Sequence, residues 1–203
     1  MSDQKLRIAV LAMQGDFERH IQRMVELGAE AFPARLPADI DDADGLIIPG
    51  GESTTIGKLI TQYGVDDAIL RAHQAGKPIY GTCAGMIVLA KEISVGSEEK
   101  GGQRKLGLLD IRVARNAFGR QVDSFETMID IPAITGNDGP PIHAVFIRAP
   151  IVESAGPAVN VLGRHAGNIV CVRQGTILGS SFHPELTTDD RVHRYFLSMI
   201  AER

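Results

Sequence analysis

The sequence predicts an α/β fold of three layers, in which helices cover both faces of a mixed, mostly parallel central sheet. Short apolar runs, typical of buried strands, alternate with amphipathic helical patterns through the first half of the chain. Such alternation favours parallel strands joined by crossover helices. The chain has 203 residues, which is enough for one sizeable core and too few for two, so we expect residues 1–203 to form a single domain.

The first half opens with the apolar run Leu6–Met13, which predicts a strand. An amphipathic helix is expected over Asp16–Leu27, where Gly28 then ends it. Four apolar residues are expected on the inward face of that helix, namely Phe17, Ile21, Met24 and Val25. The same patterns predict strands over 29–34, 44–51 and 78–80, and helices over 54–62 and 65–74.

From Leu106 onward the pattern changes to a succession of strands before a final helix over Asp189–Ala201. The strands are expected over 108–115, 122–131, 143–150, 159–165, 168–174 and 176–182. Residues 96–105, GSEEKGGQRK, are polar and contain glycine, so we expect an exposed loop there.

Charge and cysteine content exclude several classes of function. The net charge is −4 and no cluster of Lys or Arg offsets it, so there is no electrostatic case for nucleic-acid binding. The run Leu6–Met13 is too short to span a membrane and lacks a signal-peptide pattern, which makes a cytoplasmic location the expectation. Neither Cys83 nor Cys171 has a C-x-x-C partner, so a disulfide framework or a zinc site is not expected.

Cys83 lies where an apolar strand gives way to a helical pattern, between two glycines in the segment GTCAG. This is the cysteine form of the nucleophile elbow, a tight turn that presents the nucleophile above a sheet. Side chains at Gly81 and Gly85 would crowd the neighbouring helix and strand. We expect the following helix to continue through Ile93 and its N-terminus to favour a thiolate. The plainer alternative, which fits Cys171, is a small buried residue that fills space.

A nucleophilic cysteine needs a base, and His183 is the best placed of the six histidines. It ends the apolar run TILGSSF and is followed by Pro184 and Glu185. In an extended segment, residues two apart point to the same side, so Glu185 can orient the imidazole as the third member of a triad. The alternative to a triad is that His183 merely ends a strand and that Glu185 is a solvated surface residue.

The segment LIIPGGESTT supplies a third feature, because consecutive glycines after a buried strand let the backbone turn its N–H groups toward a ligand. An acyl-transfer site needs such donors for its oxyanion, together with the N–H of the residue after the nucleophile. These donors would be Gly51 and Ala84. A structural interpretation is compatible with this one: the glycines form a turn and Ser53 caps the next helix.

The combination of GTCAG, FHPE and PGGES resembles the class I (triad) glutamine amidotransferases, a family with a flavodoxin-like fold. More narrowly, the chain resembles the family of glutaminase subunits of pyridoxal 5'-phosphate synthase, through segments that run from about Ile8 to Phe196. RNAFGRQ and FIRAP make this narrower resemblance specific, because the cysteine and histidine motifs are shared by many amidotransferases.

The resemblance implies hydrolysis of L-glutamine to glutamate and ammonia through a thioester on Cys83, with His183 as base and then acid and Glu185 as its orienter. Ammonia would pass to a separate synthase subunit, and neither metal nor cofactor is required. The glutamine-binding positions carry over onto a further set of residues, namely Gly51, Glu52, Ser53, Arg115, Ile147 and Arg148. Guanidinium groups are natural partners for the carboxylate of an amino-acid substrate.

Three other functions remain open at this stage. One is the glutaminase subunit of another pathway, such as imidazole glycerol phosphate synthase, against which RNAFGRQ and FIRAP count. Another is a cysteine peptidase or esterase with the same elbow, which activity on glutamine alone would exclude. The last is a binding module that kept the fold without catalysis, against which the intact Cys83, His183 and Glu185 argue.

Overall fold

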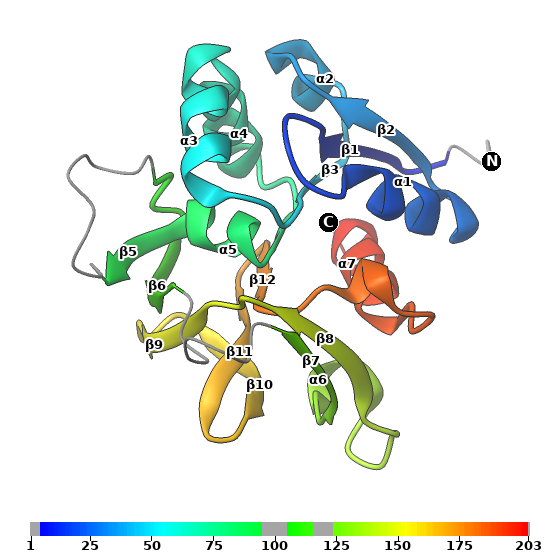
Figure 1. Cartoon of the computed structure of the whole chain (residues 1–203). Helices are drawn as coiled ribbons and strands as arrows, with labels where there is room; N and C mark the ends of the chain where they lie inside the picture. The colour runs from blue at the N-terminus through cyan, green and yellow to red at the C-terminus, as the bar shows by residue number, and fades with distance from the viewer. Residues whose placement is uncertain (1–4, 95–104, 116–123, 203) are drawn as a thin grey trace.

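Strands and helices alternate through the first half of the chain and strands dominate the second (Figure 1). The computed structural model describes residues 5–94, 105–115 and 124–202. The elements of the first half are β1 (Arg7–Leu11), α1 (Phe17–Glu26), β2 (Glu30–Ala34), α2 (Pro37–Asp41), β3 (Gly45–Ile48), α3 (Ser53–Gln62), α4 (Val65–Gln74), β4 (Ile79–Thr82), α5 (Ala84–Leu89) and β5 (Ala90–Ser94). Those of the second half are β6 (Leu109–Ala114), β7 (Ser124–Ile129), α6 (Pro132–Thr135), β8 (Ile142–Ile147), β9 (Ile151–Ala155), β10 (Asn160–His165), β11 (Asn168–Gln174), β12 (Ile177–Ser180), the 3-10 turn η1 (Pro184–Leu186) and α7 (Arg191–Ala201).

The central sheet is mixed, and the predicted α/β class is confirmed. Its strands follow the order β2-β1-β3-β4-β12-β11-β9-β6-β5, with β10 beside β11, while β7 and β8 pair separately. The run from β2 to β12 is parallel throughout, whereas β12, β11, β9 and β6 pair in antiparallel fashion. Short turns join several of the later strands, and such turns can only connect antiparallel neighbours.

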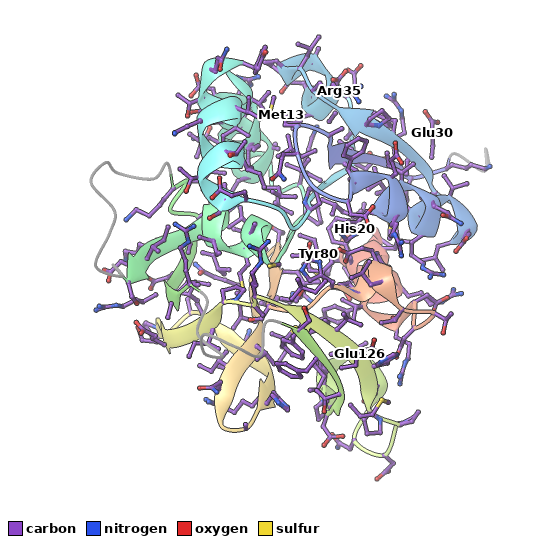
Figure 2. All side chains as sticks on the ribbon, in the orientation of Figure 1. Met13, His20, Glu30, Arg35, Tyr80 and Glu126 are labelled. Atoms are coloured by element: carbon purple, nitrogen blue, oxygen red, sulfur yellow. The ribbon has the colours of Figure 1, made fainter. Side chains whose placement is uncertain are left out.

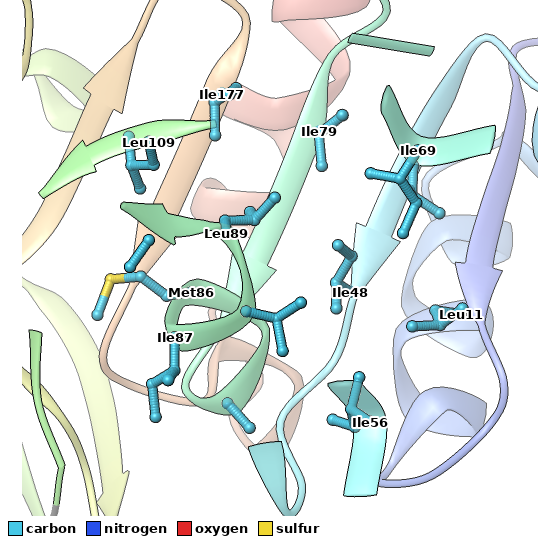
Figure 3. Packing of buried hydrophobic residues seen from close by; sticks show 14 of the residues in the cluster. Leu11, Ile48, Ile56, Ile69, Ile79, Met86, Ile87, Leu89, Leu109 and Ile177 are labelled. Atoms are coloured by element: carbon cyan, nitrogen blue, oxygen red, sulfur yellow. The ribbon is translucent and has the colours of Figure 1, made fainter. Parts of the chain in front are cut away.

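Apolar side chains fill both faces of the sheet, which is why its inner strands read as continuous apolar runs. Along β1, Ala9 and Leu11 face one core and Ile8 and Val10 face the other. The first core packs against α3, α4 and α5, as Figure 3 shows for Ile48, Ile69 and Leu89 among others. The second core packs against α1 and α7 through residues that include Met24, Val192, Phe196 and Ile200. The predicted three layers follow from these two cores.

The expected inward face of α1 is partly wrong. Val25 is 54% exposed, and His20 instead lies fully buried beside the fully buried Met24. The reason is geometric: positions 20 and 24 are one turn apart and share a face, whereas position 25 is turned away from it. Gly28 does end the helix, with a φ of +90° that a residue with a side chain rarely adopts.

The helix after Cys83 is shorter than expected. It ends at Leu89, and Ala90–Ser94 forms strand β5, which pairs in parallel with β6. Ile93 lies opposite Val113 in that pairing. Its apolar side chain therefore belongs to the pattern of a strand and not to that of a helix. A short apolar run fits either period, and here the neighbouring strand decides the outcome.

Besides β5 and η1, the described elements that were not expected are α2, α6 and β9. Both α2 and α6 are single helical turns that begin at a proline, and β9 directly follows Pro150 at the end of the expected strand 143–150. Most of the expected loop 96–105 lies outside the described residues, as does the start of the expected strand 122–131. None of the described helices is long and apolar enough to cross a membrane.

The parallel half of the sheet places four turns at one edge. β1, β3, β4 and β12 are neighbours that run in the same direction, so their carboxyl ends meet. The turns that follow them carry Gln14, Gly51, Cys83 and His183 respectively. Ligands of open parallel sheets bind outside this edge.

Candidate active site

Cys83 occupies a strained turn between β4 and α5. Its backbone has φ 49° and ψ −105°, a conformation that residues with a side chain rarely adopt. Its N–H donates to the carbonyl of Ser180 at 2.7 Å and its carbonyl accepts from the N–H of Ile87 at 3.2 Å. These bonds tie the turn to β12 on one side and to the helix on the other, so the thiol is held at a fixed position.

The glycines on either side of Cys83 allow this close packing. A Cβ atom at Gly81 would lie 2.7 Å from both the carbonyl carbon of Gly85 and Cδ1 of Leu89. A Cβ atom at Gly85 would collide with the carbonyl of Ile48 on β3. The crowding expected from the G-x-C-x-G pattern is therefore present, against the helix in one case and the strand in the other.

His183 and Glu185 lie in the turn after β12, and their side chains meet as expected. The Nδ1 atom of His183 is 2.7 Å from Oε1 of Glu185, and only 5% of Glu185 is exposed. The segment is not extended, however, because Pro184–Leu186 forms the turn η1. The N–H of His183 donates to the carbonyl of Val145 at 2.8 Å, which anchors the start of this turn to β8.

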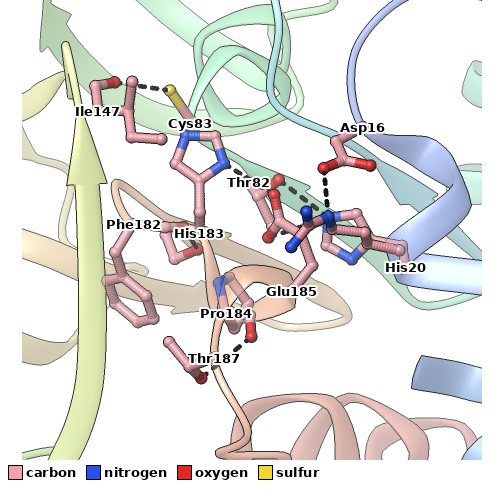
Figure 4. A network of polar contacts seen from close by, with 12 residues as sticks. Asp16, His20, Thr82, Cys83, Ile147, Phe182, His183, Pro184, Glu185 and Thr187 are labelled. Carbon is pink, nitrogen blue, oxygen red and sulfur yellow. Dashed lines mark hydrogen bonds and ion pairs between the residues drawn. The ribbon is translucent and has the colours of Figure 1, made fainter. Parts of the chain in front are cut away.

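The surroundings of His183 favour its imidazolium form. Burial lowers the pKa of His183, but its hydrogen bonds with Cys83 and Glu185 and their charges outweigh burial and raise that pKa to about 10. Burial raises the pKa of Glu185, whereas its contacts with His20 and His183 outweigh burial and lower that pKa to about 2. Figure 4 shows the ring of His183 between the sulfur of Cys83 and the carboxylate of Glu185. The arrangement suits nucleophilic catalysis by a thiolate.

A cavity of about 430 Å³ lies over Cys83 at the carboxyl edge of the sheet. All the residues that the sequence singled out for the site line it: Gly51, Glu52, Ser53, Cys83, Ala84, Arg115, Ile147, Arg148, His183 and Glu185. Gly50 also lines the cavity, and a Cβ atom there would collide with the ring of His183. The absence of a side chain at this position therefore leaves room for the imidazole.

Glu52, and not Ser53, caps helix α3. Its carboxylate accepts hydrogen bonds from the backbone N–H groups of Thr54 at 2.9 Å and Thr55 at 2.7 Å. These bonds, led by those of Thr55, overcome the effect of burial and lower the pKa of Glu52 to about 2. Ser53 is instead the first helical residue and is buried. The longer side chain of Glu52 reaches the free N–H groups from outside the helix, which leaves Ser53 inside it.

The two arginines border the cavity in different ways. Arg115 is half-buried, and its Nη2 atom lies 3.5 Å from Oε1 of Glu52. Arg148 is exposed and has a φ of 43°, in a turn directly after β8. Between them, the carbonyl of Ile147 lies 3.9 Å from the sulfur of Cys83. Both arginines therefore line the cavity, one paired with Glu52 and the other exposed.

Two residues of this region were missed by reasoning from the sequence. Gln14 lines the cavity, and its Oε1 accepts a hydrogen bond from the N–H of Glu52 at 2.6 Å. His20 is buried behind the triad, with its Nε2 atom 3.3 Å from Oε2 of Glu185. A signal for His20 existed, since it lies three residues after Phe17 and four before Met24 on the inward side of α1. The signal for Gln14 is its place in the MQGD turn after the first predicted strand, which is expected at the carboxyl edge of the sheet.

Comparison with known proteins agrees with this geometry. Residues 10–202 match the SNO glutamine amidotransferase family. The chain is similar to the pyridoxal 5'-phosphate synthase subunit PdxT of Acidothermus cellulolyticus, with 52% identity over 96% of this chain and 94% of that protein. It is likewise similar to the subunit of the same name from Streptomyces coelicolor, with 50% identity over 98% and 96% of the two chains.

A solved structure described as a glutamine amidotransferase is also similar, with a TM-score of 0.87 and 48% identity, covering 96% of this chain and 98% of that one. The match therefore covers nearly the whole of both chains. The chain belongs to the SNO glutamine amidotransferase family.

Proposed function

We propose that this chain is the glutaminase subunit of pyridoxal 5'-phosphate synthase, which hydrolyses L-glutamine to glutamate and ammonia. The observation that carries the proposal is the meeting of Cys83, His183 and Glu185 at one cavity of about 430 Å³. Nearly full-length relatives at 50% identity or more that bear the name of a pyridoxal 5'-phosphate synthase subunit support the choice of pathway. In this proposal residues 1–203 form one glutaminase domain.

The first half of the reaction forms a thioester. The Cys83 thiolate attacks the γ-carbonyl carbon of glutamine, and the negative charge that develops on its oxygen is stabilised by the backbone N–H groups of Gly51 and Ala84. The His183 imidazolium then gives its proton to the amide nitrogen, so the C–N bond breaks and ammonia leaves. Glu185 accepts the hydrogen bond of Nδ1 throughout and keeps Nε2 directed at the reacting atoms.

The second half reverses these roles. His183, now neutral, takes a proton from water, and the resulting hydroxide attacks the γ-glutamyl thioester. The same two N–H groups again stabilise the oxyanion. The C–S bond breaks, glutamate leaves, and the thiolate–imidazolium pair is restored. Each group ends in its starting protonation state, so neither a metal ion nor a cofactor is called for.

We assign recognition of the amino-acid part of glutamine to the rim of the cavity. Arg115 and Arg148 provide positive charge for the α-carboxylate, and Arg guanidinium groups bind carboxylates with two parallel hydrogen bonds. Glu52 stays ionised and half-exposed, so it can attract the α-ammonium group. The backbone at Gly51, Ser53 and Ile147 completes the wall.

The ammonia is used by a separate synthase subunit in this proposal, which the naming of the relatives as subunits of pyridoxal 5'-phosphate synthase supports. We place the reaction in the cytoplasm. Both cysteines are free, and a nucleophilic thiol such as Cys83 persists in a reducing compartment.

The test is reconstitution with a candidate synthase subunit. Co-purification, release of glutamate from glutamine, and formation of pyridoxal phosphate with glutamine as the nitrogen source are the three expected results. Glutamate release without pyridoxal phosphate formation would leave a glutaminase of another pathway. Hydrolysis of peptides or esters in place of glutamine would contradict the proposal altogether.

A further inference from the structure

A buried histidine pair lies behind the catalytic triad and contacts the oxygen of Glu185 that His183 does not use. Oε1 of Glu185 bonds to His183, and Oε2 lies 3.3 Å from Nε2 of His20. The side chains of His20 and Glu185 are 0% and 1% exposed. Apart from this 3.3 Å contact, the buried Oε2 atom has no hydrogen-bond partner among the described residues. Figure 4 shows the carboxylate between the two imidazole rings.

The second histidine of the pair comes from the far end of the chain. Nδ1 of His20, on α1, is 3.1 Å from Nε2 of His193, on α7, and both side chains are fully buried. The ring of His193 packs edge-on against Tyr80 of β4, with ring centroids 6.5 Å apart. Figure 2 labels His20 and Tyr80 near the middle of the molecule, and each of them contacts the ring of His193. Neither nitrogen of His20 therefore faces water.

The chemistry of the groups fixes the direction of these hydrogen bonds. An ionised carboxylate only accepts, so Nε2 of His20 must carry the proton that faces Oε2. The hydroxyl of Thr82, 3.4 Å from the same nitrogen, can adjust to either role. With Nε2 protonated, Nδ1 of a neutral His20 is an acceptor, and His193 must donate to it from its own Nε2. The chain of bonds then runs from His193 through His20 to Glu185.

We propose that His20 is a positioning residue for the triad, which donates from Nε2 to Oε2 of Glu185 while His193 fixes the tautomer of His20. The inference rests on the proposed glutaminase function. With both oxygens bonded, the carboxylate cannot rotate away from His183, and neither buried oxygen is left without a partner. His20 thus holds Glu185 in place, and Glu185 in turn holds His183, because catalytic side chains need their own supports to keep a productive geometry.

The environment keeps His20 uncharged, which suits this role. Burial lowers the pKa of His20, and the charge of Glu185 opposes that effect only in part. Burial and then His20 lower the pKa of His193 to about 3. The titratable groups that face His20 are Asp16, His183, Glu185 and His193. A neutral donor fixes Oε2 without neutralising the negative charge that stabilises the His183 imidazolium.

The test compares three replacements of His20 with a matched control. In His20→Gln the side-chain amide reaches the position of Nε2, in His20→Asn it reaches only that of Nδ1, and His20→Leu has no donor. Met24→Ala truncates a fully buried side chain one turn further along α1, away from Glu185. Two quantities are measured: kcat and KM for glutamine in the complex with the synthase subunit, and the pH dependence of Cys83 alkylation by iodoacetamide in the chain alone.

We expect His20→Leu to lower kcat by about 10- to 100-fold with KM nearly unchanged, the range for loss of a buried hydrogen bond to a charged group. Alkylation of Cys83 should shift to higher pH, because the imidazolium beside it is less well stabilised. His20→Gln should recover most of both properties and His20→Asn should not. Met24→Ala should lower Tm and leave both readouts near wild type.

Two results would overturn the inference: His20→Leu behaving like Met24→Ala, or His20→Gln and His20→Asn being equally impaired. If His20→Leu does not fold, the comparison of His20→Gln with His20→Asn still tests the inference. The alkylation profile keeps this test separate from the proposed function. If the wild-type chain hydrolyses no glutamine but the profile still shifts in His20→Leu, the inference stands and the proposed function fails.

Discussion

Replacing Glu185 by glutamine keeps the shape of the side chain and removes its charge, so it measures what the carboxylate does for His183. The pKa of His183 rises from 6.5 to about 10, which corresponds to about 5 kcal/mol at about 1.4 kcal/mol per tenfold change. Cys83 and Glu185 supply this together against the opposing effect of burial. If Glu185 supplies half of this stabilisation of the imidazolium, its share is about 2 to 3 kcal/mol. Loss of that share predicts a decrease of about 30- to 150-fold in kcat for Glu185→Gln.

The assay is steady-state glutamine hydrolysis with saturating synthase subunit. Glu126→Gln is the matched control, because Glu126 also pairs with a histidine, His143, at 2.8 Å, but on the exposed surface of β7 and β8. This control should keep wild-type activity. The double variant His183→Ala/Glu185→Gln should be little slower than His183→Ala alone, since an orienter has no role without its base. A loss below about fivefold in Glu185→Gln, or additive losses in the double variant, would refute this reasoning.

Three further predictions follow from the site. An electrophilic glutamine analogue should label Cys83 and spare Cys171, whose burial raises its pKa to about 12; mass spectrometry of the labelled peptides checks this, and label on Cys171 would contradict it. Arg115→Ala should raise KM for glutamine far more than it lowers kcat, while alkylation of Cys83 by iodoacetamide stays unchanged; equal losses in both assays would indicate a collapsed site. Glu185, whose folded pKa is lowered from 4.5 to about 2, should contribute about 3 kcal/mol of stability that is fully present above pH 4.5 and is lost as the pH falls toward 2. The difference in free energy of unfolding between the wild type and Glu185→Gln, measured in urea, should therefore shrink between pH 6 and pH 3, and a constant difference would count against a paired carboxylate.

The alternation of apolar runs was enough to predict the parallel half of the sheet, because each inner strand is buried on both faces and each helix shows one apolar side. The predicted helix 65–74 coincides with α4, and the predicted strand 168–174 coincides with β11. Prediction failed where a neighbour decided the outcome. Residues 90–94 form a strand because β6 lies beside them, and no local pattern carries that information.

The catalytic residues of the candidate site were predictable from the sequence, whereas the residues that hold them in place were less so. Cys83, His183 and Glu185 follow from residue types at short spacing, and the structure brings all three to one cavity. The contact between His20 and Glu185 joins residues far apart in the sequence, and only the packing of α1 against η1 creates it. Gln14 is similar, because its bond to Glu52 spans the turns after β1 and β3.

The hydrogen bond between His20 and His193 joins residues 173 positions apart, and it has a consequence for the order of assembly. Contacts of such long range form late, because the closure entropy of the intervening chain must first be overcome. The last helix, α7, also completes the core against α1 through Val192 and Phe196. During synthesis Cys83 emerges long before this helix does. A partly made chain therefore carries its nucleophile without the scaffold that fixes Glu185, and we expect full reactivity of Cys83 only after α7 has packed against α1.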